Sequence, residues 1–247
     1  MTWFNGLARS FGQSSGFEKD KESVPLLEKF LGELYIGARL ATPEARRTIE
    51  ESLLELTIHG GHTSNGLLIT QNGYFITAFH CVDKSSDLNI DVSNGDGRYY
   101  PVERVCHAWP RMDLALVKAR VYGEEEPVHL PVYEGRVEQM AESSVCSLSR
   151  WNRQIHTSMG VVDTTPVFIS CISEDHIHVN PQESFGLTFN STIRGDSGGV
   201  VVTSHGRVMG TIFSSDLKTR SHAIRFNFAI GLVNEYVQLL KGVVAYR

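Results

Sequence analysis

Apolar positions along the chain follow two different periods. Over residues 24–37 they stand three or four positions apart, which is the spacing of an amphipathic helix. A second helix is expected over residues 42–52, because it opens with a threonine that can cap its first N–H groups and a proline that needs no such partner. From residue 53 the pattern changes to alternation and short apolar runs, which are typical of β-strands. Residues 1–52 are therefore predicted to form a partly helical extension, and residues 53–247 a β-rich domain.

Short apolar runs separated by turn residues fill the β-rich region. Six strands are expected in its first half, over residues 54–58, 66–70, 74–78, 88–92, 99–105 and 114–119. Seven runs follow a solvated bend at Pro127, over residues 145–148, 155–162, 167–172, 177–179, 198–203, 208–213 and 223–228. The expected fold is an all-β core of two antiparallel six-stranded β-barrels, about residues 53–125 and about 126–230. A closing helix over residues 231–241 completes it.

Composition narrows the classes of protein that fit this pattern. The 247 residues are 41% hydrophobic and 21% charged, which is ordinary for a globular protein. The net charge of −5 argues against nucleic acid as a partner, because phosphate binding needs a basic surface. No apolar run approaches the roughly 18 residues that cross a bilayer, so we expect no transmembrane segment. The amino terminus lacks the basic start and continuous apolar core of a secretory signal.

The cysteines favour a reducing compartment. Cys81, Cys106, Cys146 and Cys171 are few and irregularly spaced, so we expect unpaired thiols and a cytoplasmic protein. The potential metal ligands lack the spacing of a zinc site. They are His59 and His62, His80 with Cys81, Cys106 with His107, and His176 with His178. We therefore expect no metal and no cofactor.

Residues 195–199, Gly-Asp-Ser-Gly-Gly, are the main candidate for a catalytic motif, and they come just before a run of β-branched residues. A serine hydroxyl becomes a good nucleophile only beside a base that an acid orients. His80, at the end of one predicted strand, and Asp113, at the start of another, fit these roles with Ser197 as the nucleophile. Three acids nearer to His80 in the sequence begin no comparably apolar strand: Asp83, Asp87 and Asp91. The glycines around Ser197 let a substrate carbonyl approach main-chain N–H groups.

At these stretches the sequence resembles the trypsin-like serine proteases of the double β-barrel fold. The order histidine, aspartate, serine is the order of that family's chymotrypsin arrangement. The flanks are similar to the bacterial HtrA (DegP-type) branch, in residues 72–77 ahead of His80 and in residues 228–230 ahead of the last helix. We expect no PDZ-sized segment after the protease region, unlike in HtrA proteins. Asn65 stands where many secreted relatives have a cysteine bridged to the one after the histidine, so that bridge is not expected.

The resemblance implies a serine endopeptidase that hydrolyses protein or peptide substrates through an acyl-enzyme and needs no cofactor. It also implies an oxyanion hole made of the N–H groups of Gly195 and Ser197. The substrate pocket would be lined by Ser191, Phe213 and Ser214. None of these is acidic, so cleavage after lysine or arginine is disfavoured and a small or medium apolar residue is expected before the cut.

Several alternatives stay open. The chain fits a catalytically silent, protease-like binding module whose oxyanion loop never adopts the working shape, and a viral polyprotein-type protease would share the fold. Asp196 needs a cation, for which Arg194 is one candidate, or N–H donors, because burying an unpaired carboxylate is costly. We expect internal contacts or a bound partner to set this loop without cleavage. The extension, residues 1–50, either covers the barrels or binds a regulatory partner.

Overall fold

The computed structural model describes most of the chain. The described residues are 21, 24–37, 42–58, 62–83, 90–93, 98–121, 126–164, 183–188, 193, 195–215 and 220–242. The predicted strands over residues 167–172 and 177–179 lie outside the described residues, as do residues 1–20 of the extension.

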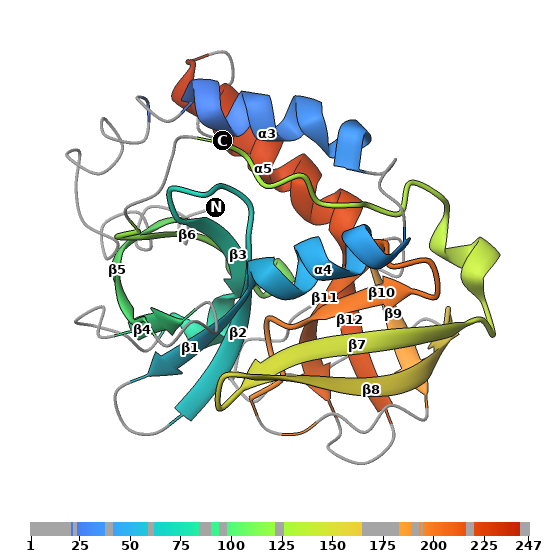
Figure 1. Cartoon of the computed structure of the whole chain (residues 1–247). Coiled ribbons are helices and arrows are strands. Elements are labelled where there is room, and N and C mark those ends of the chain that lie inside the picture. Colours follow the sequence, from blue (N-terminus) through green and yellow to red (C-terminus); the bar gives the residue numbers. More distant parts are fainter. Residues whose placement is uncertain are drawn as a thin grey trace.

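The first six strands close into an antiparallel barrel, in teal and green in Figure 1. They are β1 (Leu53–Ile58), β2 (His62–Leu68), β3 (Tyr74–Ala78), β4 (Ile90–Ser93), β5 (Tyr100–Trp109) and β6 (Leu114–Ala119). Their order around the barrel is β1-β2-β3-β6-β5-β4, and β4 closes it by pairing with β1.

The next six strands form a second closed barrel, in yellow to red in Figure 1. They are β7 (Ser144–Trp151), β8 (Gln154–Asp163), β9 (Ser184–Thr188), β10 (Val200–Thr203), β11 (Val208–Ser215) and β12 (Arg220–Arg225). The order is β10-β11-β12-β9-β8-β7, and β7 pairs with β10 to close the barrel. The prediction of two antiparallel six-stranded barrels is therefore confirmed.

Several strands are apolar on both faces because each face packs into a different core. In β3, Phe75 lies in the interior of the first barrel, whereas its neighbours Tyr74 and Ile76 join a core between the barrels and the helices. In β10, Val201 lies inside the second barrel while the valines on either side join the same shared core. A strand buried on both faces shows a continuous apolar run instead of an alternating one.

Helices cover the barrels at both ends of the chain: α3 (Val24–Gly37), α4 (Thr42–Ser52) and α5 (Phe226–Leu240). α3 lies along α5 across the top of Figure 1 and fully buries Leu27 and Phe30 in the shared core. α4 fully buries Ile49 in the same core. The described helices of the extension therefore belong to the packed fold and cover the barrels, while a regulatory partner for residues 1–50 stays a prediction.

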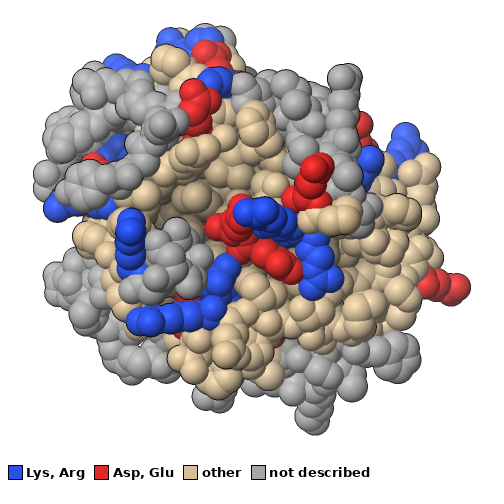
Figure 2. Space-filling view, in the orientation of Figure 1, with Lys and Arg blue, Asp and Glu red and all other residues tan. Residues whose placement is uncertain are grey.

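The outer face of α4 is highly charged. Two ion pairs span one helical turn each, Arg46 with Glu50 and Arg47 with Glu51, both at 2.7 Å. Figure 2 shows acidic and basic side chains intermixed at the middle of the visible face of the molecule, where α4 lies in Figure 1. Such exposed pairs contribute little to stability, so α4 is held mainly by its buried side.

Several predicted boundaries differ from the structure, and one strand was missed. Residues 226–228 were expected to end a strand, but they begin α5. Apolar residues continue from β12 into α5, so neither the strand period nor the helix period shows where one element ends and the other begins. β9 was not predicted, because its five residues include only two large apolar side chains; pairing with β8 and β12 defines it. The strand expected over residues 66–70 is β2, which ends at Leu68, and Thr70 makes only an isolated bridge to Pro127.

Candidate active site

His80 and Asp113 meet because two neighbouring strands end beside each other. β3 and β6 run antiparallel with Ala78 opposite Leu114, so the residues just after β3 face the residue just before β6. His80 lies in a short 3-10 turn, Phe79–Cys81, whose first N–H donates to the Asp113 carbonyl at 3.0 Å. The strand pairing therefore brings together two predicted site residues that are 33 positions apart.

The Asp113 carboxylate holds His80 by two hydrogen bonds. The carboxylate is 1% exposed and accepts the His80 backbone N–H at 2.8 Å and the ring Nδ1 at 2.6 Å. Asp113 itself has a left-handed backbone (φ +47), a conformation that aspartate tolerates better than most residues. With Nδ1–H donating to the acid, the tautomer leaves ring Nε2 as the acceptor, which is what a general base requires.

The same contacts change the pKa of His80. Burial is the largest single influence and lowers this pKa, but the hydrogen bonds and charge interactions with Asp113 and Cys81 together outweigh burial. The net effect raises the pKa of His80 well above its ordinary value of 6.5. The raised pKa means that these contacts stabilise the protonated imidazolium form of His80. The His80 side chain stays half exposed to solvent.

Ser197 lies in a tight glycine-rich turn just before β10. Gly195 and Gly198 have positive φ angles of 105° and 82°, which side-chain-bearing residues rarely adopt. The N–H of Asp196 donates to the Ile193 carbonyl at 3.2 Å, a four-residue turn with glycine at its third position. The N–H of Gly198 donates to the Ile212 carbonyl at 2.7 Å, which anchors the turn to β11. Ser197 is itself only partly buried.

Asp196 finds its partners within the fold. Its carboxylate is 7% exposed and accepts the Ser149 hydroxyl at 2.6 Å and the Ile193 backbone N–H at 2.7 Å. Among the described residues no cation pairs with it, and Arg194 lies outside them. Neutral donors thus satisfy both carboxylate oxygens, in agreement with the hypothesis that internal contacts set this loop.

The Ser197 turn crosses the seam between the barrels. Its backbone approaches β2 so closely that a Cβ added at Gly198 would lie 1.8 Å from the Asn65 carbonyl oxygen. Beside His80, buried side chains from both barrels pack together: Ala78, Cys81, Phe213 and Ile224. The described hydrogen bonds of Ser197 and His80 include none between the serine hydroxyl and the imidazole. In free enzymes such catalytic hydrogen bonds are often long and tighten only with substrate.

The predicted substrate-pocket residues have different surroundings. Phe213 is 2% exposed in the seam cluster, with its ring centroid 6.3 Å from that of His222. Ser214 is partly buried at a register shift between β11 and β12, where the strand bulges. Ser191 lies outside the described residues. The role of all three in substrate binding stays a prediction.

Two residues of the site were not predicted from the sequence, Asn65 and Ser149. Asn65 in β2 is fully buried, and its carboxamide donates to the Gly195 carbonyl at 2.7 Å. Ser149 holds Asp196 from the neighbouring strand β7. For Asn65 one signal existed, since it replaces a cysteine found in secreted relatives. A single serine within a strand carries no comparable signal.

The remaining candidate ligands form no metal centre within the described part of the chain, where no group of three or more histidine, cysteine or acidic side chains is placed to hold a metal ion. The His107 ring instead packs between two aromatic rings, edge-on to Trp109 with centroids 4.7 Å apart and stacked on Tyr236 of α5 with centroids 5.0 Å apart. His59, Cys171, His176 and His178 lie outside the described residues, and the side chain of His62 is not described. Of the described cysteines, Cys81, Cys106 and Cys146, none forms a disulfide within that part of the chain.

Comparison with known proteins agrees with this geometry. The family model of the trypsin-like peptidase domain matches residues 64–210, more than half of the chain, and the chain belongs to that family. The match runs from the strand that holds Asn65, through His80, Asp113 and the Ser197 turn, into β11.

Among curated proteins, the chain is similar to periplasmic serine endoproteases. It is 27% identical over 148 residues to DegP of Salmonella typhimurium, and 26% identical over the same length to DegP of Escherichia coli. A probable DegP-like periplasmic serine endoprotease of Chlamydia pneumoniae is 26% identical over 146 residues. Each alignment covers 59% of this chain but only 28%, 28% and 27% of the relatives, respectively. The predicted likeness to the DegP branch is confirmed at this distance.

In the described part of the chain, no helix combines the length and apolarity needed to cross a bilayer.

Proposed function

We propose that the chain is a serine endopeptidase in which Ser197 is the nucleophile, His80 the general base and acid, and Asp113 the orienting acid. The observation that carries this proposal is the His80–Asp113 hydrogen bond just after the end of β3, the strand whose Thr77 lies against Gly198 beside Ser197. Membership of the trypsin-like peptidase domain family supports it, as does the similarity to serine endoproteases.

The proposed reaction has two proton transfers in each half. As Ser197 Oγ attacks the peptide carbonyl, its proton passes to His80 Nε2, and the Gly195 and Ser197 N–H groups stabilise the resulting oxyanion. His80 then gives that proton to the departing amine, which leaves an acyl-enzyme. His80 then takes a proton from water, and the water attacks the ester. The acid product leaves, and the serine recovers its proton from His80. No metal or cofactor takes part in this sequence.

Reaction with a fluorophosphonate probe tests the proposal. The wild-type chain is expected to take up one probe, with the adduct at Ser197 on peptide mapping, while Ser197→Ala takes up none. His80→Ala is expected to slow labelling by about 10²-fold or more, since the base is lost. Ser204→Ala is the matched control, because Ser204 lies 3.3 Å from the His205 ring in an exposed turn without a bonded acid. Labelling at Ser204, or none in the wild type, contradicts the proposal.

A catalytically silent binding module is the alternative. It is favoured by one observation, the lack of a hydrogen bond between the Ser197 hydroxyl and His80 among the described contacts. The same probe separates the two functions. A folded wild-type chain that binds peptides but neither takes up the fluorophosphonate nor cleaves them fits the module.

The proposed substrates are proteins or peptides with a small or medium apolar residue before the cut. Support comes from the lack of an acidic side chain at Ser191, Phe213 and Ser214, which leaves nothing to pair with a lysine or arginine. Cleavage-site profiling on a proteome-derived peptide library tests this. A strong preference for lysine or arginine at that position contradicts it.

We also propose a cytoplasmic location and a regulatory partner that contacts residues 1–50. The thiols of the described cysteines fit a reducing compartment. Cell fractionation with maleimide trapping tests the location, and recovery from the periplasm or the medium contradicts it. Deletion of residues 1–20 tests the partner: activity in cells should change while activity of the purified chain does not.

A further inference from the structure

Asn65 makes more connections across the seam than its place in a strand requires. It belongs to β2 of the first barrel and is fully buried. Its backbone N–H donates to the Ser197 carbonyl at 2.7 Å, and its side-chain Nδ2 donates to the Gly195 carbonyl at 2.7 Å. Its Oδ1 accepts the backbone N–H of Arg150 in β7 at 2.5 Å. One residue of the first barrel thus holds both the nucleophile turn and a strand of the second barrel.

These bonds restrain the part of the turn that would bind an oxyanion. The Gly195 carbonyl is fixed by Asn65, and Asp196 on its other side is fixed by Ser149 and by the Ile193 N–H. The peptide group between Gly195 and Asp196 has both its carbonyl and its N–H bonded within the fold, so it has little freedom to rotate. The turn that carries the proposed oxyanion donors is therefore restrained before any substrate arrives, which is the preorganisation that electrostatic catalysis needs.

The carboxamide has the chemistry that this position demands. The Gly195 carbonyl requires a donor and the Arg150 N–H requires an acceptor, and an asparagine side chain supplies both at once. The backbone of Asn65 is fixed as well, because its carbonyl accepts the Thr77 hydroxyl at 2.6 Å from the strand that leads to His80. An aspartate of the same shape would keep the acceptor but turn a carboxylate oxygen towards the Gly195 carbonyl.

We propose that Asn65 is a positioning residue that holds the Gly195–Ser197 turn in its working shape from within the fold. This inference rests on the proposed endopeptidase function and concerns its regulation. The turn is set by a neutral amide and a serine hydroxyl, so neither cleavage of the chain nor a new amino terminus is needed to order it.

A purely structural role for Asn65 makes a different prediction, and Glu55 provides the matched control. Glu55 in β1 is 7% exposed and accepts the N–H groups of Asn152 and Arg153 from the β7–β8 turn. It therefore fastens the same hairpin to the first barrel with two partly buried hydrogen bonds, but none of its described hydrogen bonds reaches the Ser197 turn. Glu55→Gln weakens the seam and leaves the turn alone.

The experiment compares the full-length wild type, Asn65→Asp and Glu55→Gln at a temperature where all three are folded. Hydrolysis of p-nitrophenyl butyrate gives kcat and KM, and inhibition by acetyl-Ala-Ala-Val-aldehyde gives the affinity for a tetrahedral adduct. Asn65→Asp is expected to lower kcat and the aldehyde affinity by about 10²-fold, with KM changed less than about threefold, as for loss of an oxyanion donor. Glu55→Gln is expected to lower the unfolding midpoint with kcat within about twofold of the wild type.

The outcomes are distinguishable. If Asn65→Asp keeps kcat and aldehyde affinity while its unfolding midpoint falls like that of Glu55→Gln, Asn65 only fastens the barrels and the inference is wrong. If Asn65→Asp does not fold, Asn65→Ser carries the same comparison without a buried charge. A wild type that neither hydrolyses the ester nor takes up a fluorophosphonate overturns the proposed function itself, and the inference falls with it.

Discussion

The Asp113 carboxylate accepts two hydrogen bonds from His80, one from its backbone N–H at 2.8 Å and one from its ring at 2.6 Å. The first fixes where the histidine stands and the second fixes which ring nitrogen carries the proton. A single buried acid thus controls both the position and the tautomer of the proposed base. The His80 side chain stays half exposed to solvent.

Asp113→Asn is expected to lower kcat by about 10⁴-fold, because an amide at this place favours the wrong imidazole tautomer. It should also shift the pH profile. In the wild type the pKa of His80 is raised, so the rise of kcat/KM with pH has its midpoint above 6.5. Without the carboxylate the pKa of His80 falls, and the midpoint moves to lower pH. Steady-state kinetics between pH 5 and about 12 measure both effects.

Asp83→Asn is the control for this prediction. Asp83 is exposed and follows the same turn, with its N–H donating to the Phe79 carbonyl at 3.0 Å. Its substitution should leave both kcat and the midpoint unchanged. If the pH profile moves equally in the two variants, the negative charge near His80 sets its pKa, and the hydrogen bond to Asp113 does not.

Ser149→Ala is expected to cost about 1–3 kcal/mol of unfolding free energy, because it removes a hydroxyl donor from the buried Asp196 carboxylate. We also expect kcat to fall by about tenfold as the Ser197 turn loosens. Chemical denaturation and ester hydrolysis measure the two quantities. Ser147→Ala is the control on the same strand, since the Ser147 hydroxyl donates to the Ser158 carbonyl of β8 and not to the site. Equal losses of activity in both variants would refute the role of Ser149.

Gly198→Ala is expected to prevent labelling at Ser197 and to lower the unfolding midpoint strongly. A Cβ there would lie 1.8 Å from the Asn65 carbonyl oxygen and 2.8 Å from the Thr77 hydroxyl, so the seam must open to admit it. Gly242→Ala separates this clash from backbone strain, because Gly242 also has a positive φ but no atom within 4 Å of its would-be Cβ. Gly242→Ala should lose only about 1–2 kcal/mol. Similar losses in both variants would mean that strain, not the close approach to β2, governs Gly198.

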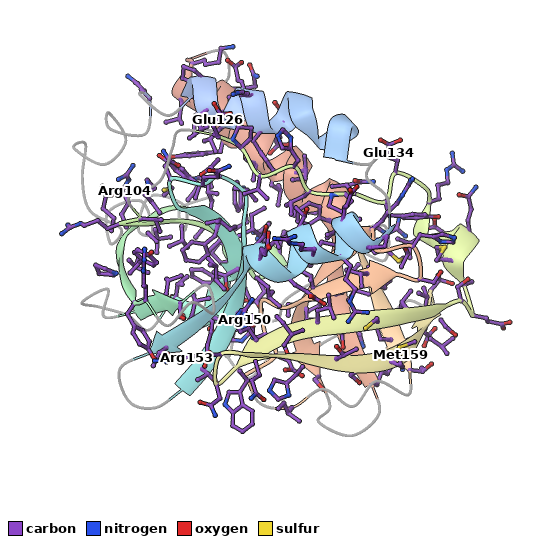
Figure 3. The ribbon with its side chains drawn as sticks, in the orientation of Figure 1. Arg104, Glu126, Glu134, Arg150, Arg153 and Met159 are labelled. Carbon is purple, nitrogen blue, oxygen red and sulfur yellow. The ribbon has the colours of Figure 1, made fainter. Side chains whose placement is uncertain are left out.

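Arg150→Met is expected to detach the end of α4 from the barrels. The Arg150 side chain is 7% exposed and lies at the seam beneath α4 (Figure 3), where its guanidinium donates to the carbonyls of Glu50 and Leu53. Methionine fills the space but leaves those carbonyls without a donor. Limited proteolysis should then cut near residue 50 at least several times faster than in the wild type.

Arg47→Ala controls for the loss of a positive charge. Arg47 lies on the exposed face of α4 and pairs with Glu51, and its substitution should leave the proteolysis rate unchanged. If Arg150→Met is cut no faster than Arg47→Ala, the guanidinium does not hold α4 in place.

The sequence predicts the parts of the site that follow local patterns. His80, Asp113 and Ser197 stand at strand ends beside short motifs, so their elements and their order along the chain were available before the structure. The buried polar side chains at the seam were not. Glu55 alternates with leucines in β1, and Arg150 lies between a serine and a tryptophan in β7, so both resemble solvent-facing positions. Only the packing of one barrel on the other buries them, and that contact leaves no periodic signal in either strand.

Non-additivity of substitutions tests the central claim that Ser197 and the His80–Asp113 pair act as one unit. The measurement is kcat for ester hydrolysis by Ser197→Ala, His80→Ala and the double variant, each against the uncatalysed rate. In a unit, the first loss removes nearly everything, so the double variant should be about as slow as either single variant. Losses that multiply in the double variant would contradict the account, because they would show that the serine and the histidine act independently.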